Sequence, residues 1–309
     1  MKILVTGGAG YIGSVLVPNL LRDGHEVTVL DSFMYGQTSL LDCCVEPRLR
    51  VIRGDTRDER VVAELLPWAD VVLPLACLTG APLCDKDPWA AKAVNHDAVR
   101  WIAERLSSQQ RLVFPSTNSG YGVGEGSILC DEDTPLRPVS LYGRLKVELE
   151  KFLLDRGYVT FRFATLFGTS PRMRLDLLVN DFAYRAVVDR FVVLFEPHFK
   201  RNYLHVRDGA GAFRHALKHY EALRGRPYNV GLSDANISKW ELCENIQKHV
   251  PGFTFIASEI GKDPDQRNYV VSNQRIETTG YRTTIGLDAG IGELIKGYQI
   301  LRRNQYSNI

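Results

Sequence analysis

The chain begins with an apolar run that leads directly into three regularly spaced glycines, Lys2-Ile-Leu-Val-Thr-Gly7-Gly-Ala-Gly10-Tyr-Ile-Gly13. A short run of Ile, Leu and Val before a glycine-rich turn is typical of a buried strand. The glycines would let the backbone turn tightly, approach a pyrophosphate closely and pack the following helix against the strand. We therefore predict a dinucleotide-binding turn in which Gly7, Gly10, Tyr11, Ile12 and Gly13 contact the cofactor. The alternative is a structural strand-to-helix turn that holds no ligand.

Asp31 follows the second predicted strand, Glu26 to Leu30, about 20 residues beyond the glycine turn. A carboxylate at that position would accept hydrogen bonds from the ribose hydroxyls of a dinucleotide and would repel a 2′-phosphate. We therefore predict NAD as the cofactor in preference to NADP. The cations Arg53 and Arg57 are the nearby residues that argue against this choice.

The composition is that of an ordinary globular protein of 309 residues, with 45% apolar content and 38 basic against 36 acidic residues. There is no basic block, so we expect neither nucleic acid nor a membrane as a partner. No apolar stretch reaches the roughly 18 residues of a membrane span, and Met1 leads straight into the first strand. We therefore expect no signal peptide and a cytoplasmic location. The six cysteines have no metal-binding spacing, which predicts reduced thiols and no metal site.

Predicted strands and helices alternate through the first half of the chain. The strands cover residues 49–53, 71–75, 111–114 and 158–163, and the helices cover 59–66, 90–106 and 139–156. Such alternation favours an α/β fold with a doubly wound, Rossmann-like parallel sheet, whose ligands bind at the carboxyl ends of the strands. Beyond residue 165, prolines interrupt shorter elements. We therefore predict an NAD-binding domain over residues 1–164, with return segments near 203–228, and a smaller, mainly substrate-binding mixed α/β domain over 165–309.

Tyr142 and Lys146 are four residues apart in the predicted helix 139–156, so both side chains project from one face. A lysine cation beside a tyrosine favours the phenolate, and a positively charged nicotinamide would add to this effect. Thr117 supplies a hydroxyl at the end of a predicted strand. Together the three residues predict an acid–base site for hydride transfer. The alternative is a surface Tyr-Lys pair on an amphipathic helix.

The glycine spacing and the Tyr142-x3-Lys146 pair, with Thr117, resemble the extended short-chain dehydrogenases/reductases that act on nucleotide sugars. This group contains 4-epimerases, 4,6-dehydratases and 4-reductases, and the resemblance covers nearly the whole chain. It implies cofactor contacts at Asp55, Thr56, Leu75, Ala76, Tyr142 and Lys146. It implies substrate contacts at Thr117, Asn118, Ser119, Arg172, Arg174, Asn180, Arg201 and Arg267. Arg201 and Arg267 would hold the diphosphate of the sugar nucleotide, although a solvated surface position is the alternative for Arg267.

Asn118 and Ser119 separate the reactions of this group. In the 4,6-dehydratases these positions hold Asp and Glu, which remove water across C5 and C6, and in the 3,5-epimerases a cysteine stands at the second position. Neither an amide nor a serine hydroxyl exchanges a proton readily near neutral pH, so we expect neither chemistry. The resemblance leaves simple C4 oxidation or reduction. In that reaction Thr117 binds the C4 oxygen, Tyr142 removes its proton and the C4 hydride passes to the nicotinamide.

Three segments narrow the resemblance further. They read Pro115-x-Thr-Asn-Ser-Gly-Tyr-Gly122, Ser170-Pro-Arg-Met-Arg-Leu-Asp176 and Asp263-Pro-Asp-x-Arg267, and together they are most similar to GDP-heptose 4-dehydrogenases of capsular heptose biosynthesis. This implies a 4-dehydrogenase acting on GDP-heptose or GDP-hexose in surface polysaccharide biosynthesis, with 2-oxoglutarate as hydride acceptor.

Other outcomes stay open at this point. Pro115 and Thr165 stand where the family frequently has serine and asparagine, and Arg172 and Arg174 could pair with Asp176 or Asp181 instead of a substrate. The alternative functions are a nucleotide-sugar 4-epimerase and a non-catalytic NAD-binding protein. The family usually dimerises, which implies a homodimer formed through helices 90–106 and 139–156.

Overall fold

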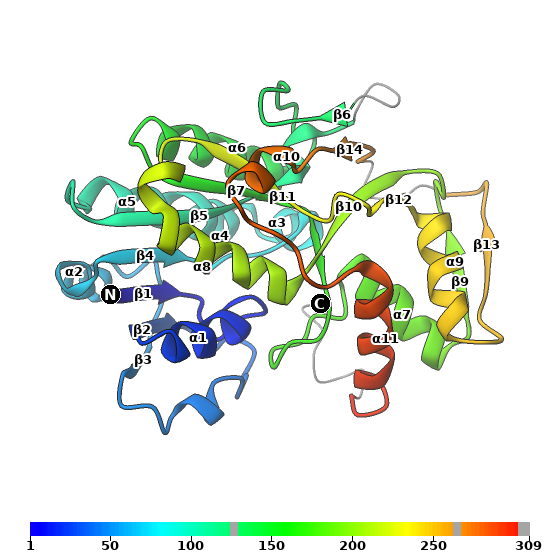
Figure 1. Ribbon diagram of the computed structural model, residues 1–309, viewed down its shortest axis with the longest axis horizontal. Helices are drawn as coiled ribbons and strands as arrows, with labels where there is room; N and C mark the ends of the chain where they lie inside the picture. Colours follow the sequence, from blue (N-terminus) through cyan, green and yellow to red (C-terminus); the bar gives the residue numbers. More distant parts are fainter. Residues whose placement is uncertain (124–128, 262–266, 302–309) are drawn as a thin grey trace.

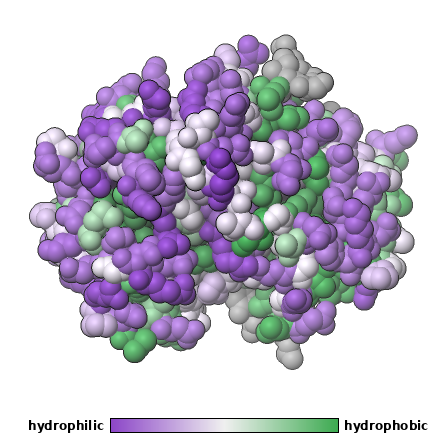
Figure 2. All heavy atoms as spheres, in the orientation of Figure 1, coloured by the Kyte–Doolittle hydropathy of each residue, from purple (hydrophilic) through white to green (hydrophobic). Residues whose placement is uncertain are grey.

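The computed structural model describes residues 1–123, 129–261 and 267–301. Figure 1 shows a large sheet flanked by helices on the left and a smaller group of helices and short strands on the right. Figure 2 shows hydrophilic residues over most of the same face, with hydrophobic residues scattered between them. Within the described ranges, no helix has the length and apolar character needed to cross a membrane.

The large sheet has seven parallel strands in the order β11-β7-β5-β4-β1-β2-β3. Their bounds are β1 Lys2–Thr6, β2 Glu26–Asp31, β3 Leu49–Arg53, β4 Val71–Pro74, β5 Arg111–Thr117, β7 Val159–Phe163 and β11 Pro227–Val230. This order runs outward in both directions from the boundary between β1 and β4, which is the doubly wound arrangement and confirms the predicted fold class. Ligands bind in such sheets where the order reverses, at the carboxyl ends of these two strands.

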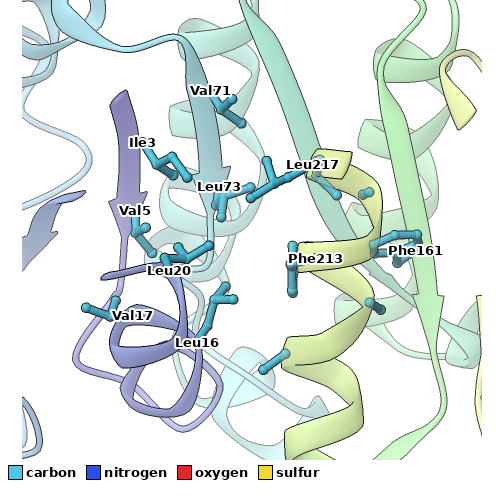
Figure 3. Close-up of a cluster of buried hydrophobic side chains, with 14 of the residues drawn as sticks. Ile3, Val5, Leu16, Val17, Leu20, Val71, Leu73, Phe161, Phe213 and Leu217 are labelled. Carbon is cyan, nitrogen blue, oxygen red and sulfur yellow. The ribbon is translucent and has the colours of Figure 1, made fainter. Parts of the chain in front are cut away.

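Helices cover both faces of this sheet. They are α1 Gly13–Arg22 and α8 Val206–Leu223 on one face, and α2 Glu59–Leu65, α5 Ala98–Arg105 and α6 Leu141–Leu154 on the other. Because successive strand residues point to opposite faces, Ile3 and Val5 of β1 pack toward α1 and α8 while Leu4 packs toward the second layer. Figure 3 shows Leu16 of α1 and Phe213 of α8 within the first of these two cores.

The smaller region is built from helices around a separate core. It contains α7 Leu178–Val188, α9 Lys239–His249 and α11 Leu287–Gly297, with short strands β8 Thr165–Phe167, β9 Phe191–Leu194, β10 Lys200–His205, β12 Asn236–Ser238 and β13 Thr254–Ala257. The strand pairs β8–β10 and β9–β13 are parallel and β10–β12 is antiparallel, as the mixed prediction requires. The remaining elements are β6 Leu129–Cys130, β14 Val270–Val271, α3 Ala81–Lys86, α4 Pro88–Lys92, α10 Gln274–Thr278 and the short helical turns η1 Leu41–Cys43, η2 Leu66–Trp68, η3 Ala93–Asp97 and η4 Asn118–Tyr121. The chain also returns to the large sheet through α8 and β11.

Residues 90–106 differ from the single α-helix predicted for them. A π-helical turn, η3, separates α4 from α5. Within that turn the Asn95 side chain accepts a hydrogen bond from the Leu78 nitrogen and donates one to the Leu78 oxygen, both at 2.8 Å. These bonds hold the segment after β4 against the helix, and π-turns of this kind occur frequently at functional sites.

Candidate active site

The glycine turn lies between the ends of β1 and β4. Gly7 has a φ of +69°, and a Cβ there would lie 2.5 Å from the Ala76 nitrogen, while a Cβ at Gly13 would lie 2.4 Å from the Gly8 oxygen. Only glycine fits these two positions, because backbone atoms occupy the space that a side chain would need. The structure therefore brings Leu75 and Ala76 at the end of β4 against the turn.

The start of α1 is suited to an anion. Gly10 lies in the turn and its oxygen accepts a hydrogen bond from the Ser14 nitrogen at 2.9 Å, and Ile12 is the residue before the helix. Among the described residues, no side chain caps this helix end and no acidic residue lies in its first turn. Its amides and the helix dipole can therefore interact with a pyrophosphate, which fits NAD.

Asp31 stands at the end of β2 and is fixed to the glycine turn. One carboxylate oxygen accepts a hydrogen bond from the Ala9 nitrogen at 2.9 Å, and the other accepts one from the Phe33 nitrogen at 2.8 Å. The Gln37 amide donates a third hydrogen bond, at 3.3 Å. A carboxylate has about four acceptor positions, so this arrangement orients Asp31 and leaves about one acceptor position for a ribose hydroxyl. Its position and chemistry fit the predicted ribose contact.

Asp55 and Thr56 follow β3 at the same edge of the sheet. A side-chain hydrogen bond from Arg57 lowers the pKa of Asp55, and the two groups form an ion pair at 2.6 Å. The Thr56 hydroxyl is buried and has no hydrogen-bond partner within the described part of the chain. A ligand at the predicted adenine end could satisfy it, because a buried hydroxyl without a partner is costly.

Lys146 is buried in α6, with 3% of its surface exposed. Its ammonium group donates a hydrogen bond to the Pro115 oxygen at 2.8 Å, lies 4.3 Å from the centre of the Phe114 ring and is within electrostatic range of the Cys77 thiol. Burial lowers the pKa of Lys146, and Cys77 acts in the opposite direction. These contacts hold the cation at the carboxyl end of β5.

Tyr142 lies one helical turn before Lys146. Burial raises the pKa of its phenol, whereas the guanidinium groups of Arg174 and Arg267 act to lower it. In the protein alone the phenol therefore keeps its proton, and the predicted phenolate needs additional positive charge, which an oxidised nicotinamide would bring. The two arginines are separated from Tyr142 by long stretches of sequence, yet the fold brings both within electrostatic range of it.

Thr117, Ser119 and Arg267 form a chain of hydrogen bonds next to α6, which packs against η4. The Thr117 hydroxyl donates to the Ser119 hydroxyl oxygen at 2.9 Å, and the Arg267 guanidinium donates to the same Ser119 oxygen. Arg267 thus lies in the site, where the sequence had left a surface position open. The Asn118 amide is buried at 1% exposure, and neither its oxygen nor its nitrogen has a partner within the described ranges.

Arg172 and Arg174 lie in the segment that follows β8. The Arg174 guanidinium forms a two-point ion pair with Asp176, which is the alternative the sequence offered, while still acting on Tyr142. The Arg172 guanidinium lies 4.4 Å from the centre of the Tyr35 ring and donates to the Met173 oxygen. Contact of either side chain with a substrate stays a prediction.

Tyr11 and Asn180 join the glycine turn to this segment. The Tyr11 hydroxyl donates to the Gly168 oxygen at 2.7 Å and accepts from the Asn180 amide at 3.2 Å. The same Asn180 amide donates to the Arg174 oxygen at 2.8 Å, and its oxygen accepts from the Gly168 nitrogen at 3.0 Å. The oxygen and the nitrogen of the Asn180 amide are thus both hydrogen-bonded within the protein, and the nitrogen holds the Arg174 backbone. This geometry does not favour the predicted contact of Asn180 with a substrate.

Arg201 of β10 has 2% of its surface exposed and donates to the Lys200 oxygen at 3.1 Å. Its guanidinium lies 5.8 Å from the centre of the Tyr269 ring. Arg201 and Arg267 both act electrostatically on the buried Tyr203 phenol. The two arginines predicted to hold the diphosphate therefore lie in one neighbourhood.

Sequence reasoning missed Cys77 and Glu293. Cys77 contacts the predicted catalytic lysine, and its position directly after the strand-end pair Leu75-Ala76 was the available signal. Glu293 of α11 binds the Thr169 backbone and hydroxyl, and no local pattern marks it. Within the described ranges, no group of three or more His, Cys, Asp and Glu residues is placed to hold a metal ion.

Comparison with known proteins places the chain among nucleotide-sugar enzymes. The model of the NAD dependent epimerase/dehydratase family matches residues 3–231. The UDP-glucose 4-epimerase of Lactobacillus helveticus is 28% identical over 86% of this chain and 87% of its own length. The dTDP-glucose 4,6-dehydratase of Streptomyces niveus is 27% identical over 97% of this chain and 93% of its own length.

A solved structure with the same fold is the UDP-glucose 4-epimerase of Thermus thermophilus in complex with NAD. It superposes with a TM-score of 0.80 at 26% identity and covers 97% of this chain and 99% of its own. These relatives support the predicted cofactor and the nucleotide-sugar class. They are 4-epimerases and a 4,6-dehydratase, and not the GDP-heptose dehydrogenases that the sequence suggested.

Proposed function

This chain belongs to the NAD dependent epimerase/dehydratase family, and the relatives compared above are enzymes that modify nucleotide sugars. We propose that this protein oxidises C4 of a nucleotide-activated sugar without dehydrating the sugar. The observation that carries the proposal is the placement of Tyr142 and the buried Lys146 on one helix packed against the turn that holds Thr117. Bound NAD⁺ would supply a hydride acceptor and a positive charge near the phenol.

In the first step, oxidation at C4, Thr117, Tyr142 and Lys146 have different roles. The Thr117 hydroxyl binds the C4 oxygen, and the Tyr142 phenol takes the C4 hydroxyl proton once its pKa is lowered by the surrounding cations. Lys146, held by the Pro115 oxygen, supplies one of these cations. Asn118 and Ser119 stand where dehydratases of the family carry Asp and Glu, so the 4-ketose has no acid–base pair that could remove water across C5 and C6.

The relatives favour 4-epimerisation as the net outcome, in which the ketose turns and takes the hydride back on its other face. One observation supports a second candidate, a GDP-heptose or GDP-hexose 4-dehydrogenase of surface polysaccharide biosynthesis. Arg174 and Arg267 both act on Tyr142 and are themselves anchored, to Asp176 and Ser119. Fixed cations around the reacting carbon would restrict the rotation that an epimerase needs. In that case the ketose leaves, and a separate acceptor such as 2-oxoglutarate must reoxidise the cofactor.

One assay separates these outcomes. The protein is incubated with UDP-, dTDP-, GDP- and CDP-sugars in deuterated water, with and without 2-oxoglutarate, and products are identified by mass spectrometry and NMR. A rearranged C4 alcohol without the oxo acid indicates an epimerase, whereas a ketose that depends on the oxo acid indicates a dehydrogenase. Enzyme-dependent deuterium at C3 or C5, or loss of water, would overturn the proposal.

Tyr142→Phe tests the proposed base in the same assay. Turnover should fall by roughly a hundredfold to ten-thousandfold, the usual contribution of a positioned acid–base group, while NAD is still bound. Tyr158→Phe is a matched control, because this tyrosine is also buried but lies just before β7, at the amino ends of the strands, with its hydroxyl against the Ala103 oxygen. Equal turnover of the two variants would contradict the mechanism. A protein that binds NAD and turns over none of these sugars in any form would instead be the non-catalytic alternative.

A homodimer is part of the proposal. The helices expected to form it, α4 to α5 and α6, lie side by side on one face of the large sheet, and Trp89 of α4 has 86% of its surface exposed. Light scattering should give twice the chain mass, and Trp89→Glu should shift the mass toward that of a single chain. A single-chain mass for the unaltered protein would refute the dimer.

A further inference from the structure

Two cysteines lie beside the proposed catalytic lysine. Cys77 follows the end of β4, and Cys84 lies in α3. Both thiols donate to the same acceptor, the Leu78 oxygen, at 3.6 Å and 3.2 Å respectively. The two sulfur atoms can therefore be no farther apart than these two distances together. Gly80 lies in the loop between them with a φ of +96°, a conformation that glycine adopts without strain.

The two thiols have different surroundings. Cys77 is partly exposed and lies within electrostatic range of the Lys146 ammonium, whereas Cys84 is fully buried and accepts a hydrogen bond from the Asn95 amide at 3.5 Å. Burial raises the pKa of Cys84 to about 12. A partly exposed thiol beside a cation is the kind that reacts with oxidants, while a buried protonated thiol is inert toward solvent. Cys77 is therefore the thiol that a dissolved oxidant reaches first.

We propose that Cys77 and Cys84 form a redox pair in which peroxide converts the two thiols to a disulfide. The Cys77 sulfur attacks the O–O bond of hydrogen peroxide, giving Cys77 sulfenic acid and one water. The Cys84 sulfur then attacks the Cys77 sulfur and displaces hydroxide, which takes the Cys84 proton and leaves as a second water. Two thiols and one peroxide thus give one disulfide and two waters, a two-electron oxidation of the protein.

The bond would disable the site through Lys146. The bond would convert the thiol beside the Lys146 ammonium into a disulfide sulfur, and the Leu78 oxygen would lose both S–H donors at once. The segment after β4, which the glycine turn contacts at Ala76, would shift as the sulfurs approach bonding distance. The loss of turnover rests on the proposed function, whereas formation of the disulfide does not.

Peptide mapping tests the bond directly. The protein, purified without reductant, is treated with hydrogen peroxide, alkylated with iodoacetamide and digested with trypsin, which cleaves after Arg60 and Lys86 and leaves both cysteines in peptide 61–86. We expect this peptide to lose two hydrogens and to escape alkylation at both cysteines, with recovery in dithiothreitol. Cys44 is exposed and serves as the internal control. In protein molecules that contain the Cys77–Cys84 disulfide, Cys44 should still be alkylated.

Variants connect the bond to activity. Peroxide should lower turnover of the unaltered protein and of Cys44→Ser by roughly a hundredfold, reversibly in dithiothreitol. Peroxide-treated Cys77→Ser should turn over substrate as fast as the untreated Cys77→Ser sample. Cys84→Ser should form no intramolecular disulfide after peroxide treatment. Alkylation of both cysteines after peroxide treatment would overturn the proposal, as would equal inactivation of Cys77→Ser and the unaltered protein. If no sample turns over any sugar nucleotide, the proposed function fails, and the mass of peptide 61–86 still decides the redox pair.

Discussion

Glu293 should make the stability of this protein depend on acidic pH. Its carboxylate accepts hydrogen bonds from the Thr169 nitrogen at 3.0 Å and from the Thr169 hydroxyl, and Arg207 binds its other oxygen. Burial acts to raise the pKa of Glu293, but the His205 ring, whose Nε2 lies 3.4 Å from the carboxylate, and the hydrogen bonds from Thr169 outweigh it and lower the pKa from 4.5 to about 2. The folded protein therefore prefers the ionised carboxylate.

The sign and size follow from this difference in pKa. A carboxyl group whose pKa is lowered on folding contributes its full stabilisation above the unfolded pKa and loses it as the pH falls toward the folded value. At about 1.4 kcal/mol per unit, the difference corresponds to at most about 3 kcal/mol. The Glu293 side chain is 22% exposed, so solvent screening keeps the contribution below this bound. Roughly 1 kcal/mol should be lost by about pH 4.

Glu293→Gln should therefore lower the free energy of unfolding by about 2 kcal/mol at about pH 7, and this gap should narrow by about 1 kcal/mol at about pH 4. Urea denaturation followed by circular dichroism measures both values, provided that the denaturant slopes of the two proteins agree. Glu148→Gln is the control, because that side chain is 67% exposed and should change stability by less than about 0.5 kcal/mol at either pH. A gap for Glu293→Gln that is equal at the two pH values would refute the reasoning.

Three further predictions concern the cofactor turn and the core. Gly7→Ala should weaken NAD binding by more than about tenfold in a fluorescence titration, because its Cβ would meet backbone, whereas Gly280→Ala, with a φ of +90° in open space, should bind NAD normally. Asp31→Ser should reduce the preference for NAD over NADP by about tenfold in the same titration, and an unchanged ratio would contradict the ribose contact. Arg162→Met should lower the free energy of unfolding by about 3 kcal/mol, because it removes the ion-pair partner that lies 2.8 Å from the buried Glu150 carboxylate. The double variant with Glu150→Leu should recover part of this loss, because no buried charge is then left unpaired.

Local motifs made the fold and half of the site predictable from sequence. Each of these features follows a short-range rule. The glycines mark a tight turn, Thr117 lies at the end of a strand, and Tyr142 and Lys146 are one helical turn apart. The strand order follows from regular alternation of strands and helices. The predicted strand 111–114 was three residues too short, since β5 extends to Thr117, and the predicted helix 139–156 was two residues too long at each end. The π-turn at Asn95 was also not predicted, because it depends on side-chain hydrogen bonds to Leu78.

Contacts between distant segments were not predictable in the same way. Arg267 reaches Ser119 across 148 residues, and Glu293 reaches Thr169 across 124. The first contact depends on how the later part of the chain packs against the large sheet, and the second on packing within the smaller region; no local spacing encodes either. Asn180 illustrates the same limit, since its amide is committed to the Tyr11 hydroxyl and other partners within the protein.

The arrangement of the site separates the hydride step from the fate of its product. The groups that would remove the C4 proton and hold the dinucleotide come from the large sheet and α6, and their positions follow from the fold that the whole family shares. Arg174 and Arg267, which also act electrostatically on Tyr142, come from the later part of the chain. In the proposed mechanism, oxidation depends on residues of the first half and the fate of the ketose on residues of the second, so altering only the second set would change the product. For this reason the family match establishes the class of chemistry, and we expect the difference between an epimerase and a dehydrogenase to depend on Arg174 and Arg267, together with Asn118 and Ser119.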